Sequence, residues 1–196
     1  MSGSAAVGPG PQTVALLRGG PRAAVQVAVL ALHLRGAVAA GPPGTIRTSG
    51  PSSGTSFTSG LALERAVRGS LYLPAGLREL MQRPRVRRAL AELRSEAAAA
   101  GLLRPLPPHR TRAARRTLRE LRAAFPPPTG PRGLSTDEVL LAVALYGDSA
   151  LTELVPGFTE AAGLTGRGGR QEERGLPWSG GGEGGGFSGC AGGWGA

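Results

Sequence analysis

One pattern occurs twice along the chain and predicts much of its architecture. A Pro-Arg pair opens an apolar, helix-forming stretch, and a glycine closes it before a short apolar segment. The first copy runs from Pro21 to Gly36 and the second from Pro84 to Gly101. Proline suits the first turn of a helix, and glycine suits the left-handed position after its last turn. Each copy therefore predicts a helix followed by an extended segment, as in the third helix and wing of a winged-helix unit.

Hydrophobic periodicity predicts further helices around these two copies. Ser135 and Glu138 have the spacing of a capping box, which marks the start of one of them. In the second copy the wing is expected to be missing or reduced, because Pro105, Pro107 and Pro108 follow residues 102–103 and leave no room for a full second strand. The expected helices span residues 11–17, 21–35, 61–68, 75–81, 84–100, 109–125, 136–146, 148–155 and 158–164, and residues 37–40 and 45–48 are expected to pair as a hairpin.

The predicted fold class is mainly α, with two winged-helix-like helical units, a minor β-hairpin, a disordered N-terminus and a Gly-rich C-terminal tail. Gly, Ser and Pro clusters set the boundaries between these parts. The expected organisation is 1–10 disordered, 11–48 first unit, 49–60 linker, 61–125 second unit with a basic helix, 126–134 Pro/Gly linker, 135–164 C-terminal helical segment and 165–196 Gly-rich disordered tail.

The charge of the chain is concentrated in one segment. The net charge is +10, every one of the 23 basic residues is Arg, and Lys is absent. Between Arg83 and Arg122, twelve Arg face only three Glu, which gives this segment a charge of +9. A codon bias toward Gly, Ala, Pro and Arg in a GC-rich genome accounts for the choice of Arg over Lys. The clustering still indicates attraction to polyanions.

Two predicted helices carry the candidate polyanion-binding residues. Those of the second-copy helix lie on its exposed part, and those of the following basic helix line one face opposite a stripe of Leu and Phe. The candidates are Arg85, Arg87, Arg88, Arg94, Arg112, Arg115, Arg116, Arg119 and Arg122. Such a face suits phosphate backbones, anionic lipid or an acidic protein equally well, and it can also be a solvated face with no ligand. The first-copy helix is apolar nearly all round and is expected to be a packed scaffold.

The sequence offers little for catalysis, so we expect no enzyme, cofactor, metal site or small-molecule substrate. Cys190 is the single cysteine, which excludes an intramolecular disulfide. His33 lies in an apolar helix and His109 beside a proline, and neither has a Cys or carboxylate at metal-ligand spacing. The glycine cluster at residues 166–169 lacks the Lys-Ser/Thr of a phosphate-binding loop. The Gly-rich tail is expected to be a disordered end, and the alternative is a Gly- and aromatic-rich segment that assembles or docks.

Membrane insertion is not expected from the apolar stretches considered one by one. The longest, residues 23–34 and 139–146, are shorter than the roughly 20 residues that span a bilayer. The first twelve residues lack the basic and apolar regions of a signal peptide. We therefore expect a cytoplasmic location.

Three strings resemble an uncharacterised family of high-GC Gram-positive bacteria. They are LLRGGPRAAVQVAVLALHLRGAV, GTIRTSG and VLLAVALYGDSALTELVP, at residues 16–38, 44–50 and 139–156. Members share the Gly-Gly-Pro-Arg start of a helix, the Ala-Leu-Tyr-Gly segment and a Gly-rich, Cys-bearing tail. The resemblance implies no activity, ligand or cofactor. Many relatives are described as membrane proteins because they carry a spanning segment, and this sequence departs from them there.

These observations favour a non-catalytic interaction module with a protein partner, in the cytoplasm or peripheral to the inner face of the membrane. The alternative is a nucleic-acid-binding regulator that uses residues 83–122. A weaker alternative is binding to an anionic lipid surface through the same basic helix.

Overall fold

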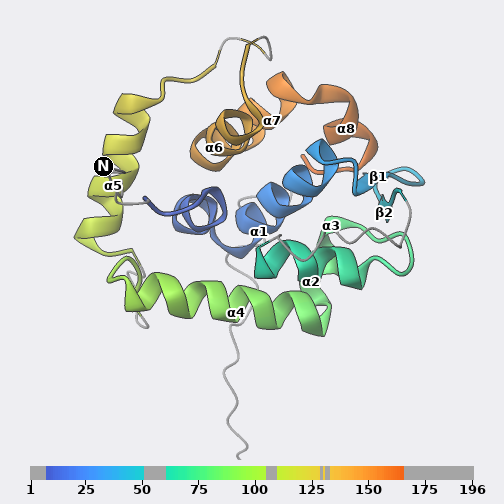
Figure 1. The fold of residues 1–196 in the computed structure, drawn as a ribbon, viewed down its shortest axis with the longest axis horizontal. Coiled ribbons are helices and arrows are strands. Elements are labelled where there is room, and N and C mark those ends of the chain that lie inside the picture. Colours follow the sequence, from blue (N-terminus) through green and yellow to red (C-terminus); the bar gives the residue numbers. More distant parts are fainter. Residues whose placement is uncertain (1–7, 51–60, 105–109, 129, 131–132, 166–196) are drawn as a thin grey trace, which may run out of the picture. The chain divides into compact units, whose positions relative to one another are not determined.

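Helix α1 (Pro11–Leu34) lies at the centre of the fold (Figure 1). The computed structural model describes residues 8–50, 61–104, 110–128, 130 and 133–165. Within these residues α1 packs against helices on several sides and against the hairpin that follows it. All residues from Ala23 to Leu32 are buried. A helix that is apolar nearly all round must be covered on all sides, so the sequence of α1 requires this central position.

Helix α1 bends sharply at Gly19 and Gly20. Both residues have non-helical backbone angles, and Gly20 has a φ of 73°. Glycine adopts a positive φ at little cost, and Pro21 restarts the helix where its missing N–H would have no partner anyway. The predicted boundary between two successive helices is confirmed. We call residues 11–18 and 21–34 the two arms of α1.

A buried carboxylate on α2 (Ala62–Ser70) connects the far ends of the two arms. Glu64 is 4% exposed; it accepts a hydrogen bond from the Gln12 amide at 2.9 Å and forms an ion pair with Arg35. In one straight helix Gln12 and Arg35 would be about 34 Å apart. Because a single carboxylate contacts both side chains, the arms fold back toward each other.

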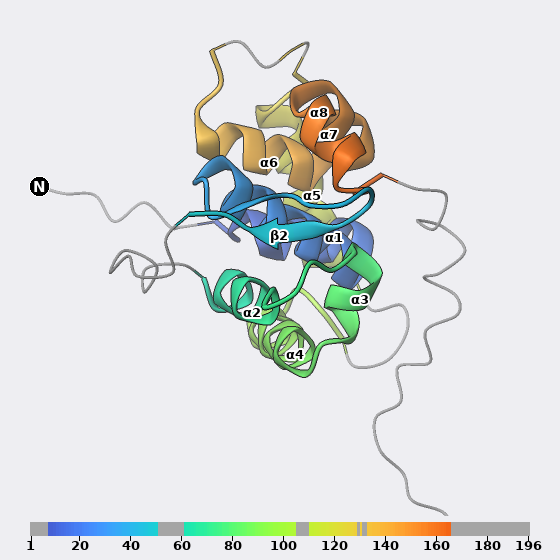
Figure 2. The same ribbon diagram turned by 90° about the vertical axis from the view of Figure 1, so that its right-hand side faces the viewer.

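Most of the other helices form two groups, one on each side of α1 (Figure 2). On one side lie α6 (Thr136–Tyr146), α7 (Asp148–Leu154) and α8 (Pro156–Ala161). On the other lie α2, α3 (Leu77–Gln82) and α4 (Pro84–Ala99), while α5 (Arg112–Ala124) contacts α1 and α6. One hydrophobic core joins all of them. The predicted mainly α fold with a small hairpin is confirmed.

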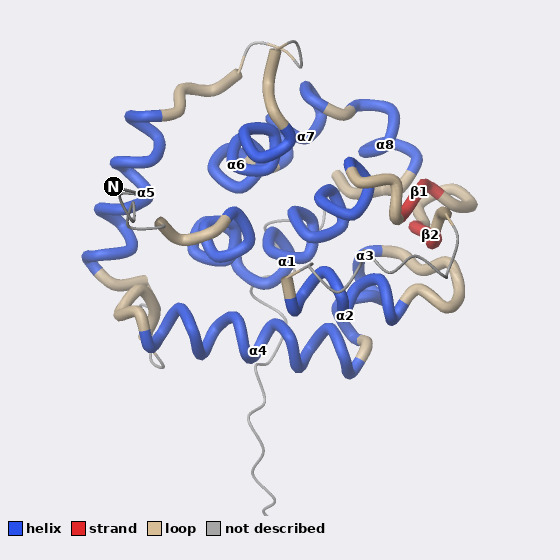
Figure 3. The backbone as a smooth tube through the Cα atoms, viewed as in Figure 1, coloured by secondary structure: helices blue, strands red, loops and turns tan. Residues whose placement is uncertain are grey.

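The hairpin of β1 (Val38–Ala40) and β2 (Ile46–Thr48) is held from two sides (Figure 3). Ile46 makes a two-hydrogen-bond bridge to Ala75, in the connection between α2 and α3. At the turn, the Gly44 N–H donates to the Ala161 carbonyl of α8 at 3.0 Å. Residues 11–48 and 61–125 are thus joined by the backbone pairing of Ile46 with Ala75 as well as by a common core. Their description as two winged-helix-like units stays a prediction.

The repeated pattern of the sequence is present in both copies. Gly36 and Gly101 each have a φ of 70°, and the residue after each donates back into the last turn of the helix. This is the usual way in which a left-handed glycine satisfies terminal carbonyls. The first copy continues into β1, whereas in the described part of the second copy Leu103 makes an isolated bridge to Arg110. The Pro-rich segment at 105–109, on which the expectation of a missing or reduced wing rests, lies outside the described residues.

Most helix boundaries differ from the prediction by a few residues, and local caps explain two of the differences. Helix α5 begins at Arg112 because the Thr111 side chain accepts a hydrogen bond from the Ala114 N–H. Helix α8 begins at Pro156, which takes the first-turn position where the sequence pattern had indicated an interruption. The capping box of α6 is confirmed in both of its hydrogen bonds. Of the predicted disordered N-terminus (1–10), linker (49–60) and Gly-rich tail (165–196), residues 1–7, 51–60 and 166–196 lie outside the described residues.

By length and composition α1 qualifies as a membrane-crossing helix, with a mean hydropathy of 1.2. The sequence-based expectation rested on residues 23–34, which lie in the second arm alone and are too short to span a bilayer. In the structure 72% of the apolar window is buried inside the fold, and Gly19 and Gly20 prevent the arms from forming one rod. The apolar surface of α1 is therefore used in packing.

We predict that Glu64→Ala lowers the free energy of unfolding by about 2 kcal/mol. Breaking a fully buried ion pair costs more, but Arg35 is 43% exposed and keeps part of its hydration. Urea unfolding measures the effect. Glu153→Ala, at an exposed position of α7, is the control and should stay within about 0.5 kcal/mol of the parent. Equal, small effects of the two substitutions would contradict the importance of the Glu64 contact.

Candidate interaction surface

The nine arginines predicted to bind polyanions lie on the outer sides of α4 and α5. We call them the basic surface: Arg85, Arg87, Arg88 and Arg94 of α4, and Arg112, Arg115, Arg116, Arg119 and Arg122 of α5. All are exposed except Arg94, which is half-buried. The opposite faces of the same two helices supply Val86, Leu90 and Leu118 to the core. Helical amphipathicity alone places the charges outward.

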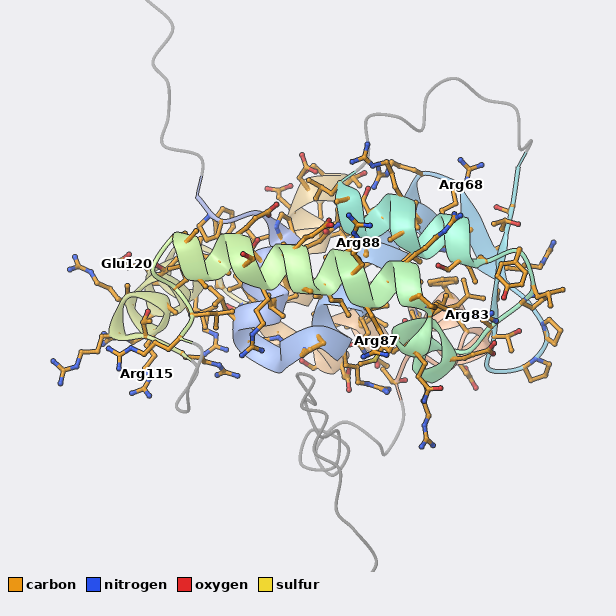
Figure 4. The ribbon with its side chains drawn as sticks, turned by 90° about the horizontal axis from the view of Figure 1, so that it is seen from below. Arg68, Arg83, Arg87, Arg88, Arg115 and Glu120 are labelled. Atoms are coloured by element: carbon orange, nitrogen blue, oxygen red, sulfur yellow. The ribbon has the colours of Figure 1, made fainter. Side chains whose placement is uncertain are left out.

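On α4 the arginines flank a strip of small residues. Arg87 and Arg88 extend from opposite edges of the helix (Figure 4). Ala91, Ser95 and Ala98 are exposed and follow one another at helical spacing. The outer side of α4 is therefore low along its middle. By helical spacing Arg87 and Arg94 share one edge, while the other edge carries Arg85 and Arg88 together with Glu92 and Glu96.

On α5 the arginines extend into solvent from a helix that is anchored at both ends. Thr111 caps its start, and the Arg122 guanidinium donates to the Leu145 carbonyl near the end of α6 at 3.4 Å. A cation at a helix C-terminus also interacts favourably with the helix dipole. Ala114 and Leu118 are the buried residues of α5. Arg112, Arg115 and Arg119 remain exposed on the outer side.

Two exposed ion pairs neutralise a minor part of this charge. Arg88 pairs with Glu92 at 3.1 Å and Arg116 with Glu120 at 2.7 Å, each one helical turn apart. The hydrogen bond from Arg116 to Glu120, with their charge attraction, raises the pKa of the Arg116 guanidinium above its usual value. Such surface pairs are weak and exchange readily with water or a ligand. The basic surface therefore keeps most of its positive charge available.

The basic surface has no enclosed pocket among its described residues. Its shallow depression is lined by Arg116, Arg119, Glu120 and Ala123 and is open to solvent. Small-molecule sites are usually concave and bury most of their ligand. This shape fits contact with a larger, charged partner.

An exposed apolar tip lies beside the start of α4, and the sequence analysis did not identify it. Residues 72–74 (Tyr-Leu-Pro) connect α2 to α3, and Tyr72 and Leu73 are 69% and 60% exposed. The Arg83 guanidinium lies 4.8 Å from the centre of the Tyr72 ring and donates hydrogen bonds to the Tyr72 hydroxyl and to Glu79. A Tyr and a Leu next to a proline in a short connection are a signal that could have indicated this tip.

The polar residues of α1 are engaged inside the fold, which confirms its interpretation as a packed scaffold. Gln26 donates to Asp148 and to the Leu164 carbonyl, at 3.1 and 2.8 Å. The His33 ring stacks on Phe158 with centroids 3.7 Å apart, and Arg22 donates to the same Leu164 carbonyl. None of these side chains is presented to a groove of nucleic acid.

The described residues contain no group of three or more His, Cys, Asp or Glu side chains that could hold a metal ion. His109 and Cys190 lie outside the described part of the chain. No protein-family model, curated protein or solved structure matches the chain. The candidate site is therefore argued from its own geometry.

We predict that the apolar tip contributes little to stability, in contrast to its buried neighbour. Leu71 is 2% exposed, so Leu71→Ala should cost about 2–4 kcal/mol through lost burial and a cavity. Tyr72→Ala removes mainly solvent-facing surface and a cation–π contact, so its cost should stay below about 1 kcal/mol. Thermal or urea unfolding compares the two. A Tyr72→Ala cost as large as that of Leu71→Ala would mean that the tip is structural.

Proposed function

We propose that the protein is a non-catalytic interaction module that binds a protein partner through the basic surface. The observation that supports this most is that α4 and α5 carry nine arginines, eight of them exposed, on their outer sides. Their apolar sides already anchor both helices in the core. Like charges held on neighbouring helices repel one another, so a binding role explains them better than stability does. The proposed location is the cytoplasm or the inner face of the membrane.

The geometry of the hairpin favours a protein partner over nucleic acid. A wing that enters a DNA groove must project, but the turn at Gly44 is bonded to α8 and Ile46 is bonded to Ala75. Helix α4 lies lengthwise against α1 and α2, and the side chains on its outer strip are short. Direct readout of bases relies on longer polar side chains at the centre of such a helix.

Nucleic-acid binding is retained as a second candidate function because of the charge alone. Twelve Arg against three Glu between residues 83 and 122 would support sequence-independent contact with phosphates. Binding to anionic lipid through α5 rests on the same charge. Both would weaken steeply as salt concentration rises.

We predict that the full chain captures a defined protein from a lysate of its own organism and that the arginines of α5 are required. The lysate is treated with nuclease and cleared of membranes before capture. Arg115→Glu with Arg119→Glu should abolish the capture, because exposed charges of the opposite sign repel an acidic surface. Arg170→Glu with Arg174→Glu makes the same change in net charge at two arginines that are not among the nine of the basic surface, and should leave the capture intact.

Three results would contradict the proposal. The first is that no protein is captured. The second is that the parent and both double variants capture the protein equally. The third is that a ligand is captured only when nuclease treatment or membrane removal is omitted. The last result would support the nucleic-acid or the lipid candidate instead.

A further inference from the structure

The two helices of the basic surface, α4 and α5, face different directions, which limits the shape of a partner. Viewed from the side of α4, that helix lies across the molecule while α5 is seen nearly end-on (Figure 4). Arg87 and Arg88 project from α4, and Arg115 projects from α5 at the far end. A straight duplex or a flat bilayer contacts one of these two helices at a time. A flexible chain can follow α4 and continue onto α5.

The chemistry of the two helices distinguishes between flexible polyanions. Proteins that bind single-stranded nucleic acid combine positive charge with aromatic side chains on which bases stack. Helices α4 and α5 contain no aromatic residue, and the exposed rings lie only at the two ends of the surface, Tyr72 beside the start of α4 and Phe125 after α5, so no row of bases could stack along it. Carboxylates need no such platform, because Arg pairs with them through charge-assisted hydrogen bonds. The surface therefore fits an acidic polypeptide better than single-stranded nucleic acid.

The apolar tip supplies an anchoring point at the opposite end of α4 from α5. Arg83, the residue before α4, holds the Tyr72 ring through its cation–π contact and hydrogen bond. An aromatic side chain held in place and flanked by Arg is typical of the residues that dominate protein interfaces. Leu73, next to it, offers further exposed apolar area. A partner that covered this tip would remove both side chains from water.

We propose that the basic surface and the apolar tip bind one acidic, extended polypeptide segment. Its apolar residue packs on Tyr72 and Leu73, and its carboxylates pair with the arginines of α4 and then of α5. The sixteen residues of α4 rise about 24 Å, which about seven or eight residues of extended peptide cover. The short side chains of Ala91, Ser95 and Ala98 leave room for this peptide between the two charged edges. This inference rests on the proposed function and names the chemistry of its partner.

The test compares fluorescent probes by anisotropy with the full chain at about 50 mM salt, where charge contacts are weakly screened. One probe is a peptide of about 12 residues, rich in Glu and Asp, with a Leu-Phe pair at one end. Its twin has Ser-Ser in place of the pair. A DNA duplex and a single strand of similar charge, and vesicles with anionic or neutral headgroups, complete the set.

The Leu-Phe peptide should bind at least about fivefold more tightly than the Ser-Ser twin, as expected for burial of large apolar groups. Tyr72→Ala with Leu73→Ser should bring this ratio close to one, with an unchanged circular dichroism spectrum. Arg115→Glu with Arg119→Glu should weaken both peptides and preserve the ratio. Arg170→Glu with Arg174→Glu is again the matched control.

A ratio of one in the parent chain would overturn the inference, as would tighter binding of DNA or anionic vesicles than of either peptide. If capture of a protein from the lysate requires Arg115 and Arg119, but the Leu-Phe and Ser-Ser peptides bind equally, only this inference fails. If no protein depends on those arginines, the proposed function fails first and the inference fails with it.

Discussion

The return of α1 on itself at Gly19 and Gly20 is the constraint on which the rest of the structure depends. An apolar helix of 24 residues cannot remain in water, and a straight rod of that length would be about 36 Å long. The two glycines divide it into two arms short enough to be covered on all sides by the surrounding helices. Glu64 then fixes the ends of both arms with one buried carboxylate.

This arrangement also separates the charges of the molecule. Residues 61–99, which include α2 to α4, carry eight Arg and four Glu, whereas residues 134–165, which include α6 to α8, carry five acidic residues and no Arg or Lys. The group of α2, α3 and α4 and the group of α6, α7 and α8 lie on opposite sides of α1 (Figure 2). An approaching acidic partner is therefore attracted to one side and repelled by the other, so the charge distribution helps to orient the encounter.

Local signals predicted much of the fold. The proline and glycine positions around Pro21 and Pro84, and the capping box at Ser135, act over a few residues, and the helix boundaries follow from them. The outward position of the nine arginines followed from helical periodicity. Contacts between distant residues could not be predicted in this way. The pairing of Ile46 with Ala75, the Glu64 contacts and the exposure of Tyr72 depend on how helices pack together, which no short window of sequence encodes.

A distance between two spin labels tests the fold-back of α1 most directly. With Cys190 replaced by Ser, labels are attached to cysteines placed at Thr13 and Leu34, neither of which is buried. The shared contact with Glu64 limits the ends of the arms to about 20 Å from each other by side-chain reach. Pulsed electron paramagnetic resonance should therefore give a distance below about 25 Å. A distance near or above the roughly 32 Å of a continuous helix would contradict the account.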